Sequence, residues 1–459
     1  MKKLLFFLTF LSLCAAPFLS ACNPDSSRNP GGIKDIEYAK AGEFFWGAYF
    51  TPPPEGIFQN NPGYATKEHY QNIADCGFNN AIAIYEESLN TVLPALELCE
   101  EVGLTYYPRF LNVNAVINSP PDYELTDSDK NNIKGFLDVV TQSPAFGGIY
   151  AVDEPQIGRI PSIKLLRDYV DTIYPGVDLM VSHLAPSARD YQSGTSVPFN
   201  RDLHTGYLDV IKPPYLLYDS YSLTQDRFGR PGLFEPYVND FQMMAEYGAE
   251  YGIPVYFFLL SLGHLNYRTT DNYRDMAWQM NLAYSYGFRG ALTFTYWTPL
   301  GDDPTANYTH ALITTTGEKS DIYYAMQQVI DEYKPFNDVY MSFNWKGTML
   351  INGDPDYPNA GFRYVENRLK EHERLTEIIC NQDTAIGAFK DANGRDGFMI
   401  ANQSDPYYNL TSEMSITFAD ADYVVVWKKG LQRIVPLKNG TYETKIASGE
   451  GEFLIPFSK

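Results

Sequence analysis

Short apolar runs alternate with longer amphipathic stretches along most of the chain. Continuous hydrophobic runs of this length are typical of parallel strands that are covered on both faces. Eight such runs predict strands, at Phe44–Thr51, Phe78–Tyr85, Leu104–Leu111, Phe146–Val152, Asp178–His183, Tyr215–Tyr221, Val255–Leu262 and Gly290–Trp297. Between and after them, apolar residues at helical spacing predict helices at Lys67–Asp75, Thr91–Glu101, Lys130–Val140, Ser162–Ile173, Glu235–Tyr251, Asp271–Tyr286 and Ser320–Tyr333.

Glycines separate many of these helices from the strands that follow. A glycine at such a position supplies the left-handed residue that commonly ends a helix, and the set comprises Gly77, Gly103, Gly176, Gly252 and Gly287. Eight strand–helix units over roughly 300 residues match the size of a (β/α)8 barrel. An open doubly wound sheet is the alternative, but the first strand is followed by Thr51-Pro52-Pro53-Pro54 rather than by a glycine-rich phosphate loop. The pattern therefore favours a (β/α)8 (TIM) barrel over residues 41–340.

The pattern changes at about Phe343. Short alternating runs separated by Asp, Asn and Gly now predict an antiparallel β-sandwich over residues 341–459. The runs are Gly397–Asn402, Met414–Phe418, Tyr423–Trp427, Arg433–Pro436 and Gly451–Phe457. We expect a helical insertion around Tyr364–Glu373. The fold class is thus α/β, with a small all-β domain after the barrel.

The N-terminus has the features of an export signal. Lys2 and Lys3 precede an apolar run that is too short to span a bilayer. The run ends in Leu19-Ser20-Ala21-Cys22, which resembles the lipobox of bacterial lipoproteins. Residues 1–21 are therefore predicted to be removed and Cys22 to be acylated. An ordinary signal peptide followed by a chance cysteine is the alternative.

A polar segment follows the predicted acylation site. Residues 22–40 are expected to form a flexible tether, and Asn23, directly after the cysteine, favours the outer membrane. We expect an extracytoplasmic protein, anchored by lipid on the periplasmic or the cell-surface side.

Composition narrows the function classes. The net charge of −21 argues against nucleic acid as a partner, because a nucleic-acid binder must neutralise phosphates. Six histidines occur without a metal-binding spacing, and no dinucleotide or Walker motif follows a strand, so we expect neither a metal nor an organic cofactor. Three cysteines follow the predicted acylation site, Cys76, Cys99 and Cys380. Their odd number and the lack of a paired spacing disfavour a disulfide framework.

Functional side chains of such a barrel belong at the carboxyl ends of its strands. Strand four has the strongest signal there, because two adjacent acids, Asp153 and Glu154, follow a largely apolar run and precede Pro155. Burying carboxylates is costly unless they are paired or used. A solvated loop pair or a helix-capping group is the structural alternative.

The strand-four tripeptide resembles motifs of two groups of barrel glycosidases. Many retaining glycosidases have Asn-Glu-Pro at this place, with the Glu as acid/base, but this chain has Asp153 instead of Asn, and Val255–His264 on strand seven lacks their second acid. The adjacent pair looks more like that of N-acetylhexosaminidases of glycoside hydrolase families 20 and 123. That resemblance implies a carbohydrate substrate whose own acetamido oxygen attacks, Glu154 as general acid and base, and Asp153 as the group that orients the acetamido.

Further candidates lie at other strand ends. Asp219, on strand six, and Glu86, on strand two, are candidates for the second carboxylate of a conventional mechanism; Asp219 is equally compatible with pairing an arginine. Within the resemblance, a tyrosine would bind the acetamido oxygen and a tryptophan would form the sugar platform, although large aromatics also fill barrel ends. The candidates for substrate contact are Tyr218, Tyr296, Trp297, His264 and Arg109, of which the last is more expected to pair with a carboxylate. A non-catalytic glycan-binding lipoprotein is the remaining alternative.

Overall fold

The computed structural model describes residues 42–57, 63–85, 87–268, 272–300, 306–353 and 359–458. The predicted signal peptide, the acylation site at Cys22 and the tether lie outside these residues, and so does Glu86. The described residues belong to one compact unit that extends from Glu37 to Lys459.

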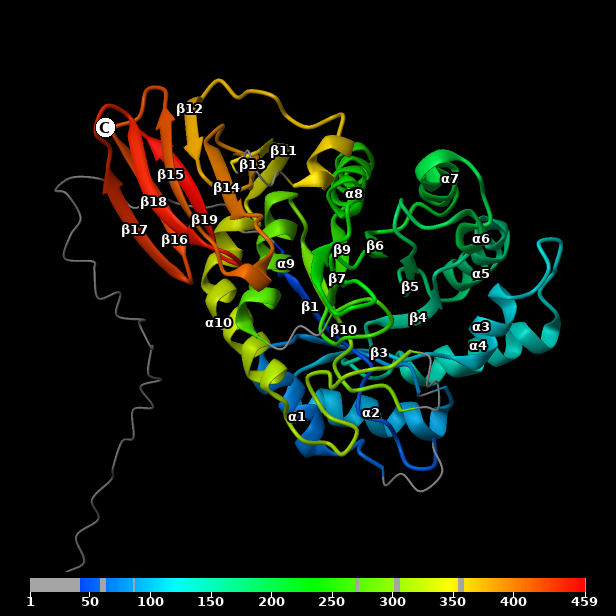
Figure 1. Cartoon of the computed structure of the whole chain (residues 1–459). Helices are drawn as coiled ribbons and strands as arrows, with labels where there is room; N and C mark the ends of the chain where they lie inside the picture. Colours follow the sequence, from blue (N-terminus) through cyan, green and yellow to red (C-terminus); the bar gives the residue numbers. More distant parts are fainter. Residues whose placement is uncertain are drawn as a thin grey trace, which may run out of the picture. The chain divides into compact units, whose positions relative to one another are not determined.

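Eight parallel strands form the central sheet, and each corresponds to a predicted run. They are β1 (Phe45–Tyr49), β2 (Asn80–Ile82), β3 (Thr105–Tyr107), β4 (Gly148–Asp153), β5 (Asp178–His183), β6 (Leu216–Asp219), β9 (Val255–Leu260) and β10 (Gly290–Phe294). Their order is β3-β2-β1-β10-β9-β6-β5-β4, and parallel bridges from Tyr106 to Phe146 and from Arg109 to Tyr150 join the two end strands. The predicted barrel is confirmed (Figure 1).

Helices follow the strands and surround the sheet (Figure 1). They are α1 (Lys67–Cys76), α2 (Leu89–Val102), α3 (Leu111–Ile117), α4 (Asp127–Val140), α5 (Ile160–Ile173), α6 (Asp190–Ser193), α7 (Arg201–Ile211), α8 (Tyr237–Tyr251), α9 (Tyr273–Ser285) and α10 (Asp321–Tyr340). The predicted glycines all have positive φ, and four of them stand at helix ends: Gly77, Gly103 and Gly252 directly after α1, α2 and α8, and Gly287 one residue further after α9. The fifth, Gly176, lies in the turn beyond α5, which already ends at Ile173. Cys76 and Cys99 are buried in α1 and α2, and neither forms a disulfide.

Two local predictions were wrong. The third strand was predicted over Leu104–Leu111 but covers only Thr105–Tyr107, because the chain turns into α3, which begins at Leu111. Residues 364–373, all of which the structure describes, form no helix: a short 3-10 helix ends at Tyr364, and the backbone N–H of Leu369 then donates to the Thr348 carbonyl oxygen, 2.9 Å away on the first strand of the sandwich. This long-range hydrogen bond replaces the local ones of a helix. The α7 helix, in turn, was not predicted.

The carboxyl-terminal part consists of two antiparallel sheets. Its strands are β11 (Phe343–Ile351), β12 (Leu375–Cys380), β13 (Thr384–Asp391), β14 (Asp396–Asn402), β15 (Thr411–Phe418), β16 (Tyr423–Lys428), β17 (Leu431–Pro436), β18 (Thr441–Ala447) and β19 (Gly451–Phe457). The larger sheet has the order β11-β13-β14-β19-β16-β17 and the smaller the order β12-β15-β18. Apolar side chains of both sheets share one core, so the predicted sandwich is confirmed.

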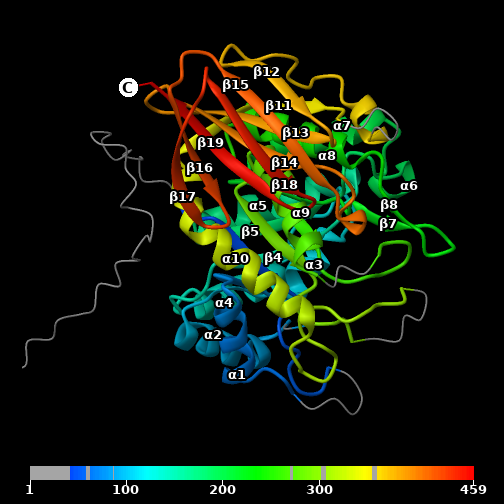
Figure 2. The same ribbon diagram turned by 60° about the vertical axis from the view of Figure 1, so that its left-hand side comes forward.

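The larger sheet is covered on both faces, by the smaller sheet and by helices of the barrel. Phe453 of β19 packs against Phe336 and Tyr340 of α10, with ring centroids 5.3 and 6.4 Å apart. A Cβ atom on Gly387 would lie 2.1 Å from the Ser285 carbonyl oxygen of α9, so only glycine permits this approach. Figure 2 shows the strands of the sandwich running across α9 and α10. Close apolar packing therefore joins the sandwich to the barrel.

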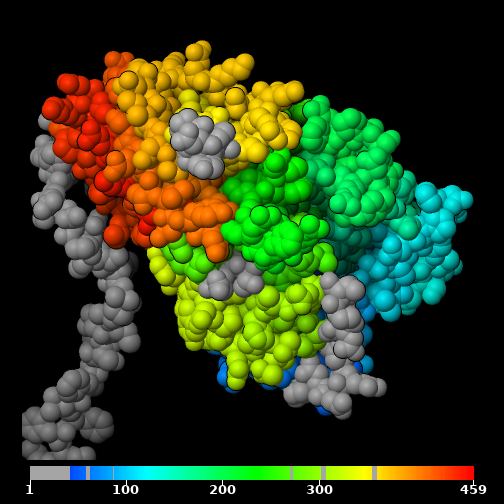
Figure 3. All heavy atoms as spheres, viewed as in Figure 1, coloured from blue at the N-terminus to red at the C-terminus, as the bar shows by residue number. Residues whose placement is uncertain are grey.

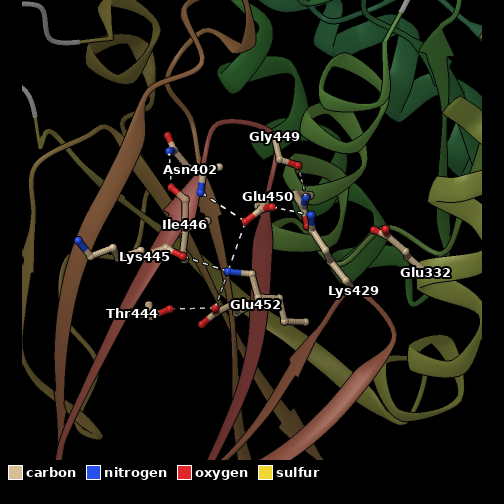
Figure 4. A network of polar contacts seen from close by, with 12 residues as sticks. Glu332, Asn402, Lys429, Thr444, Lys445, Ile446, Gly449, Glu450 and Glu452 are labelled. Carbon is tan, nitrogen blue, oxygen red and sulfur yellow. Dashed lines mark hydrogen bonds and ion pairs between the residues drawn. The ribbon is translucent and has the colours of Figure 1, made fainter.

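A charged network stabilises one end of the sandwich (Figure 4). Glu452 is fully buried and accepts a hydrogen bond from Tyr442 at 2.9 Å, while Lys428 Nζ lies 3.1 Å from its carboxylate. Glu450 pairs with the next lysine, Lys429, at 2.6 Å. Both of these acids therefore have a basic partner.

Two short strands form a hairpin after β6, on the side of the barrel where its strands end. They are β7 (Leu223–Gln225) and β8 (Pro231–Leu233), which pair in antiparallel register. A salt bridge between Arg268 and Asp405, at 2.9 Å, links the loop that follows β9 to the sandwich. The sandwich thus reaches the same side of the barrel as the hairpin.

Candidate active site

The end of β4 presents two acids to solvent. Asp153 is the last residue of the strand and Glu154 follows it, and both residues are exposed. Glu154 has a φ of 45°, a left-handed conformation that is uncommon for a residue with a side chain, and its backbone N–H donates to the Ser182 carbonyl oxygen at 2.8 Å. Strained backbone of this kind concentrates at functional sites.

Polar groups surround Asp153. Although this residue reaches solvent, the surrounding protein removes hydration and raises the pKa of the carboxyl, against the opposing effects of the Tyr150 and Ser182 hydroxyls and the Arg109 guanidinium. The hydroxyls of Tyr49 and Tyr150 lie 3.1 Å apart beside this group. The neutral hydroxyls and the positive charge of Arg109 therefore stabilise the ionised form of Asp153 and limit the rise of its pKa.

Asp219 brings a third carboxyl to the same place. It ends β6, and its carboxyl is within hydrogen-bonding reach of that of Glu154. Burial and the charges of Glu154 and Asp153 raise the pKa of Asp219 well above its usual value. Although Glu154 also reaches solvent, the protein around it removes part of its hydration, and this loss together with the charge of Asp153 raises its pKa, while the hydrogen bond with Asp219 opposes that rise. The three acids are called the carboxyl cluster below.

Two carboxyls in contact require a proton between them, because both cannot ionise easily at that separation. The pair formed by Glu154 and Asp219 therefore retains a proton at a pH at which isolated carboxyls have lost theirs. A proton donor with a raised pKa, next to the carboxyl of Asp153, suits general acid catalysis in which a positive charge develops. The sequence placed these acids at the ends of strands four and six, and the fold brings them together.

An aromatic wall flanks the carboxyl cluster; it consists of Tyr221, Tyr267, Phe294 and His264. Burial and the charges of the three acids raise the pKa of the Tyr221 hydroxyl, so this tyrosine lies within electrostatic reach of them. Its ring packs against those of Tyr267, Phe294 and His264, at centroid distances of 5.3, 5.2 and 5.6 Å. Burial lowers the pKa of His264 to about 4, so the imidazole is neutral at neutral pH.

Tyr218 does not belong to this wall. Its ring is fully buried against Phe241 of α8 and Phe288, with centroid distances of 6.0 and 5.9 Å. Side chains of successive residues on a strand point to opposite faces. Asp219 faces the barrel mouth, and Tyr218 therefore faces the covering helix. The predicted acetamido contact through Tyr218 gains no support from this position.

Tyr296 and Trp297 are also covered. Tyr296 is fully buried beside Phe78, at a centroid distance of 5.8 Å. Trp297 is fully buried beneath Tyr64 and His69, at 4.9 and 5.1 Å. Both positions correspond to the structural alternative, in which these aromatics fill the end of the barrel, and neither ring offers an open face to a sugar.

Arg109 pairs with a carboxylate at the barrel mouth. Its Nε lies 3.5 Å from a carboxylate oxygen of Glu87, and both side chains are partly exposed. Its charge also acts on Asp153 and on Tyr49. Arg109 therefore lies at the rim of the carboxyl cluster, between Glu87 and the acids of the site.

Four tyrosines that surround the acids were not among the predicted site residues. Tyr49 and Tyr150 lie on β1 and β4, and their rings meet inside the barrel at a centroid distance of 5.3 Å. Tyr221 stands two residues after Asp219. Strand alternation was a usable signal for these three, because inward-facing positions near a strand end can be read from the pattern. Tyr267 lies in the loop after β9, whose course no periodicity predicts.

Two further features of the described residues bear on the site. No group of three or more histidine, cysteine, aspartate or glutamate side chains among them has a geometry that could hold a metal ion. None of their helices combines the length and the apolar character needed to cross a bilayer.

Comparisons with known proteins agree with the fold. No protein-family model matches the chain, and no curated protein matches its sequence. A structure described as a glycoside hydrolase is similar over 90% of this chain and 93% of its own, with a TM-score of 0.54 and 9% identity. A family 5 glycoside hydrolase from Bacteroides vulgatus ATCC 8482 is similar over 90% and 89%, with a TM-score of 0.52 and 10% identity.

A third similar structure is a family 39 glycoside hydrolase from the gut symbiont Bacteroides cellulosilyticus WH2. The similarity covers 90% of this chain and 81% of that one, with a TM-score of 0.50 and 11% identity. At such low identity the likeness establishes the fold, a (β/α)8 barrel followed by a β-sandwich, and not the reaction. The chain is therefore similar in architecture to glycoside hydrolases of several families.

Proposed function

We propose that this protein is a glycoside hydrolase and that Glu154 is its general acid and base. The observation that carries the proposal is the carboxyl cluster at the ends of β4 and β6, in which the pKa of each acid is raised. Hydrolysis of a glycosidic bond needs a protonated acid at the leaving oxygen and negative charge near the cationic ring that forms. The cluster can supply both.

Substrate-assisted attack by an acetamido group is the preferred mechanism. A hydrogen bond couples Glu154 with Asp219, as the opposite effects it has on their pKa values indicate, whereas the two catalytic carboxyls of retaining and inverting enzymes flank the substrate at about 5–5.5 Å and about 6.5–9.5 Å. In the preferred mechanism Asp153 orients the acetamido group. Tyr221, rather than the buried Tyr218 or Tyr296, supplies the hydroxyl that binds the acetamido oxygen.

A conventional pair of carboxylates is the second candidate. Asp219 lies opposite Glu154, and a substrate that separated the two would create a donor and a nucleophile or base. The two mechanisms differ in their substrates, because only the first requires a 2-acetamido group. Binding of a sugar without any hydrolysis would instead indicate the non-catalytic alternative.

The test is release of chromophore from aryl glycosides with and without a 2-acetamido group. We expect hydrolysis of the acetamido sugars by the wild type and its loss in Glu154→Gln. Asp178→Asn is the matched control and should stay active: burial raises the pKa of that carboxyl to about 6, but it begins β5, at the opposite end of the barrel. Hydrolysis of plain hexosides would support the second candidate, and full activity of Glu154→Gln would overturn the proposal.

We also propose that Cys22 carries the acyl chains that attach the protein to the outer membrane. The support is the lipobox-like sequence that ends at this cysteine. Acyl chains there would keep the enzyme at the membrane without a spanning helix. Metabolic labelling with a radioactive fatty acid tests this: the label should enter the wild type and be absent from Cys22→Ala.

A further inference from the structure

A second polar pocket lies between the barrel and the sandwich, apart from the carboxyl cluster. It has a volume of about 300 Å³, and its walls come from the β7–β8 hairpin, from the residues around Asn359 and from the segment between β14 and β15. None of the three acids of the cluster lines it. In Figure 3 the green atoms of the middle of the chain meet the orange atoms of the sandwich on the face shown.

Gln403 provides the feature that points to a ligand. It lines the pocket, it is 1% exposed, and its side-chain Nε2 has no hydrogen-bond partner among the described residues. Leaving a buried amide donor unpaired is unfavourable, so a partner is expected. A bound molecule with an oxygen acceptor would satisfy it.

The orientation of this amide follows from its neighbours. Asn359 Nδ2 donates to the Tyr237 hydroxyl at 3.1 Å, and that hydroxyl in turn donates to Gln403 Oε1 at 3.4 Å. The Tyr237 hydroxyl donates to Gln403 Oε1, so the carbonyl oxygen of the amide faces the tyrosine. The NH2 group is therefore the end of the amide that has no partner among the described residues.

Three acids line the pocket, Glu235, Asp383 and Asp405, and none of them favours a cation. Glu235 pairs with Arg363 at 3.1 Å. Asp383 accepts the backbone N–H of Gly353 at 3.0 Å, and Asp405 accepts that of Tyr407 at 2.9 Å while pairing with Arg268. Their charges are thus engaged by the protein, and an unpaired NH2 donor repels a cation. Polar walls that hold both donors and acceptors suit a ligand with several hydroxyl groups.

We propose that this pocket is a second, non-catalytic subsite that binds one sugar unit of a glycan. Tyr408 is 58% exposed and lines the pocket, so its ring offers a flat apolar face of the kind against which a sugar packs. The volume is at the lower end of the range for ligand pockets, which suits a single unit. The choice of a glycan as the ligand rests on the proposed function. The β7–β8 hairpin begins two residues after Tyr221 and its second strand lines the pocket, so one short segment connects the two sites.

The experiment is ligand-observed NMR of the full chain with methyl glycosides of N-acetylglucosamine, N-acetylgalactosamine, galactose and fucose. It uses the Glu154→Gln background, in which hydrolysis does not consume the probe. Tyr408→Ala and Gln403→Leu should each weaken binding of one of these sugars by about tenfold, the loss expected from one contact. Tyr324→Ala is the matched control, because Tyr324 is 56% exposed, lies on α10 and does not line the pocket.

A second readout locates the bound sugar. Hydrogen exchange of residues 403–410 should slow when the sugar is added, whereas binding at the carboxyl cluster would leave this segment unchanged. Thermal unfolding of Gln403→Leu is measured alongside, because a substitution at this buried residue can prevent folding. Tyr408 is exposed, so Tyr408→Ala should fold and tests the subsite independently.

The outcomes separate the two proposals. Binding unchanged in Tyr408→Ala, or no binding of any of the four sugars, overturns the subsite. Hydrolysis of aryl glycosides without binding at the pocket removes the subsite alone, whereas binding at the pocket without any hydrolysis removes the proposed activity alone.

Discussion

Two groups of acids in this molecule experience opposite electrostatic environments. In the sandwich, burial by itself would raise the pKa of Glu450, but the hydrogen bond from Lys429 and the charges of Lys428 and Lys429 lower it. At the barrel mouth, the acids of the carboxyl cluster face one another, and the pKa of each is raised. The difference lies in the partners, because loss of hydration acts to raise the pKa in both groups and the side chains are of the same chemical type.

The comparison separates structural from functional carboxyls. An acid paired with a lysine stabilises the fold and stays ionised, so it cannot donate a proton near neutral pH. Acids that face other acids destabilise the fold slightly and keep a proton that a reaction can use. Substitutions in the two groups should therefore act on different quantities, activity at the barrel mouth and stability in the sandwich.

The largest effect is expected for Glu154→Gln. Loss of a general acid lowers kcat/KM by about 10²–10⁴-fold. The fold should be at least as stable as before, because the amide replaces a carboxyl whose pKa the fold raises. Steady-state kinetics on the best aryl glycoside, together with thermal unfolding, measure both quantities. A large loss of stability in this variant would contradict the division between the two groups.

Asp405→Asn should give the largest loss of stability. The salt bridge between Arg268 and Asp405 is nearly buried, with side chains 7% and 11% exposed. Breaking such a pair leaves an uncompensated charge and costs about 3–5 kcal/mol. Urea unfolding measures the loss, and Asp420→Asn, at an exposed position of the sandwich, is the control for the change of acid to amide. An unchanged transition would show that the pair contributes nothing to the contact between barrel and sandwich.

Glu452→Gln should destabilise the sandwich by about 2 kcal/mol without changing catalysis. The amide can still accept from Tyr442 or Thr444, but it loses the charge that pairs with Lys428. Denaturant unfolding and kcat/KM are measured on the same sample. A fall in kcat/KM with no change in stability would reverse the expected assignment.

Asp153→Asn should shift the pH dependence of activity. The charge of Asp153 helps to raise the pKa of Glu154, and the acid must be protonated to act, so activity falls as pH rises through that pKa. Removing the charge should move this alkaline limb of kcat/KM to lower pH by about one unit. A limb that stays in place, or moves upward, would show that Glu154 does not titrate as the acid.

The smallest effects are opposite in sign for Asp219→Asn and Glu450→Gln. Because the pKa of Asp219 is raised on folding, the fold loses stability as pH rises above about 4, so the amide should gain about 1 kcal/mol at pH 7 and nothing at about pH 3. The lowered pKa of Glu450 means that its stabilisation is present at pH 7 and lost as pH falls below about 4. Its amide should therefore cost about 1 kcal/mol at pH 7 and less at about pH 3. Thermal unfolding of both variants at pH 7 and at about pH 3 tests whether Asp219→Asn stabilises the fold and Glu450→Gln destabilises it.

Local pattern carried most of the fold. Continuous apolar runs located all eight barrel strands, and four of the five predicted glycines marked helix ends, because both signals depend only on neighbouring residues. Local signals failed where distant contacts decide. Leu369 gives its backbone hydrogen bond to Thr348 rather than to a helix, and the apolar pattern alone did not indicate this.

The sequence by itself also determined where the acids stand, because Asp153, Glu154 and Asp219 follow predicted strands and the ends of parallel strands meet on one side of a barrel. Only the tertiary structure decided which aromatic side chains face that mouth. It turned Tyr218 and Tyr296 into the core and set Tyr221 beside the acids. The reason is physical: strand ends and loops fix the direction of each side chain, and the pKa of a carboxyl depends on the charges that folding brings within a few ångströms of it.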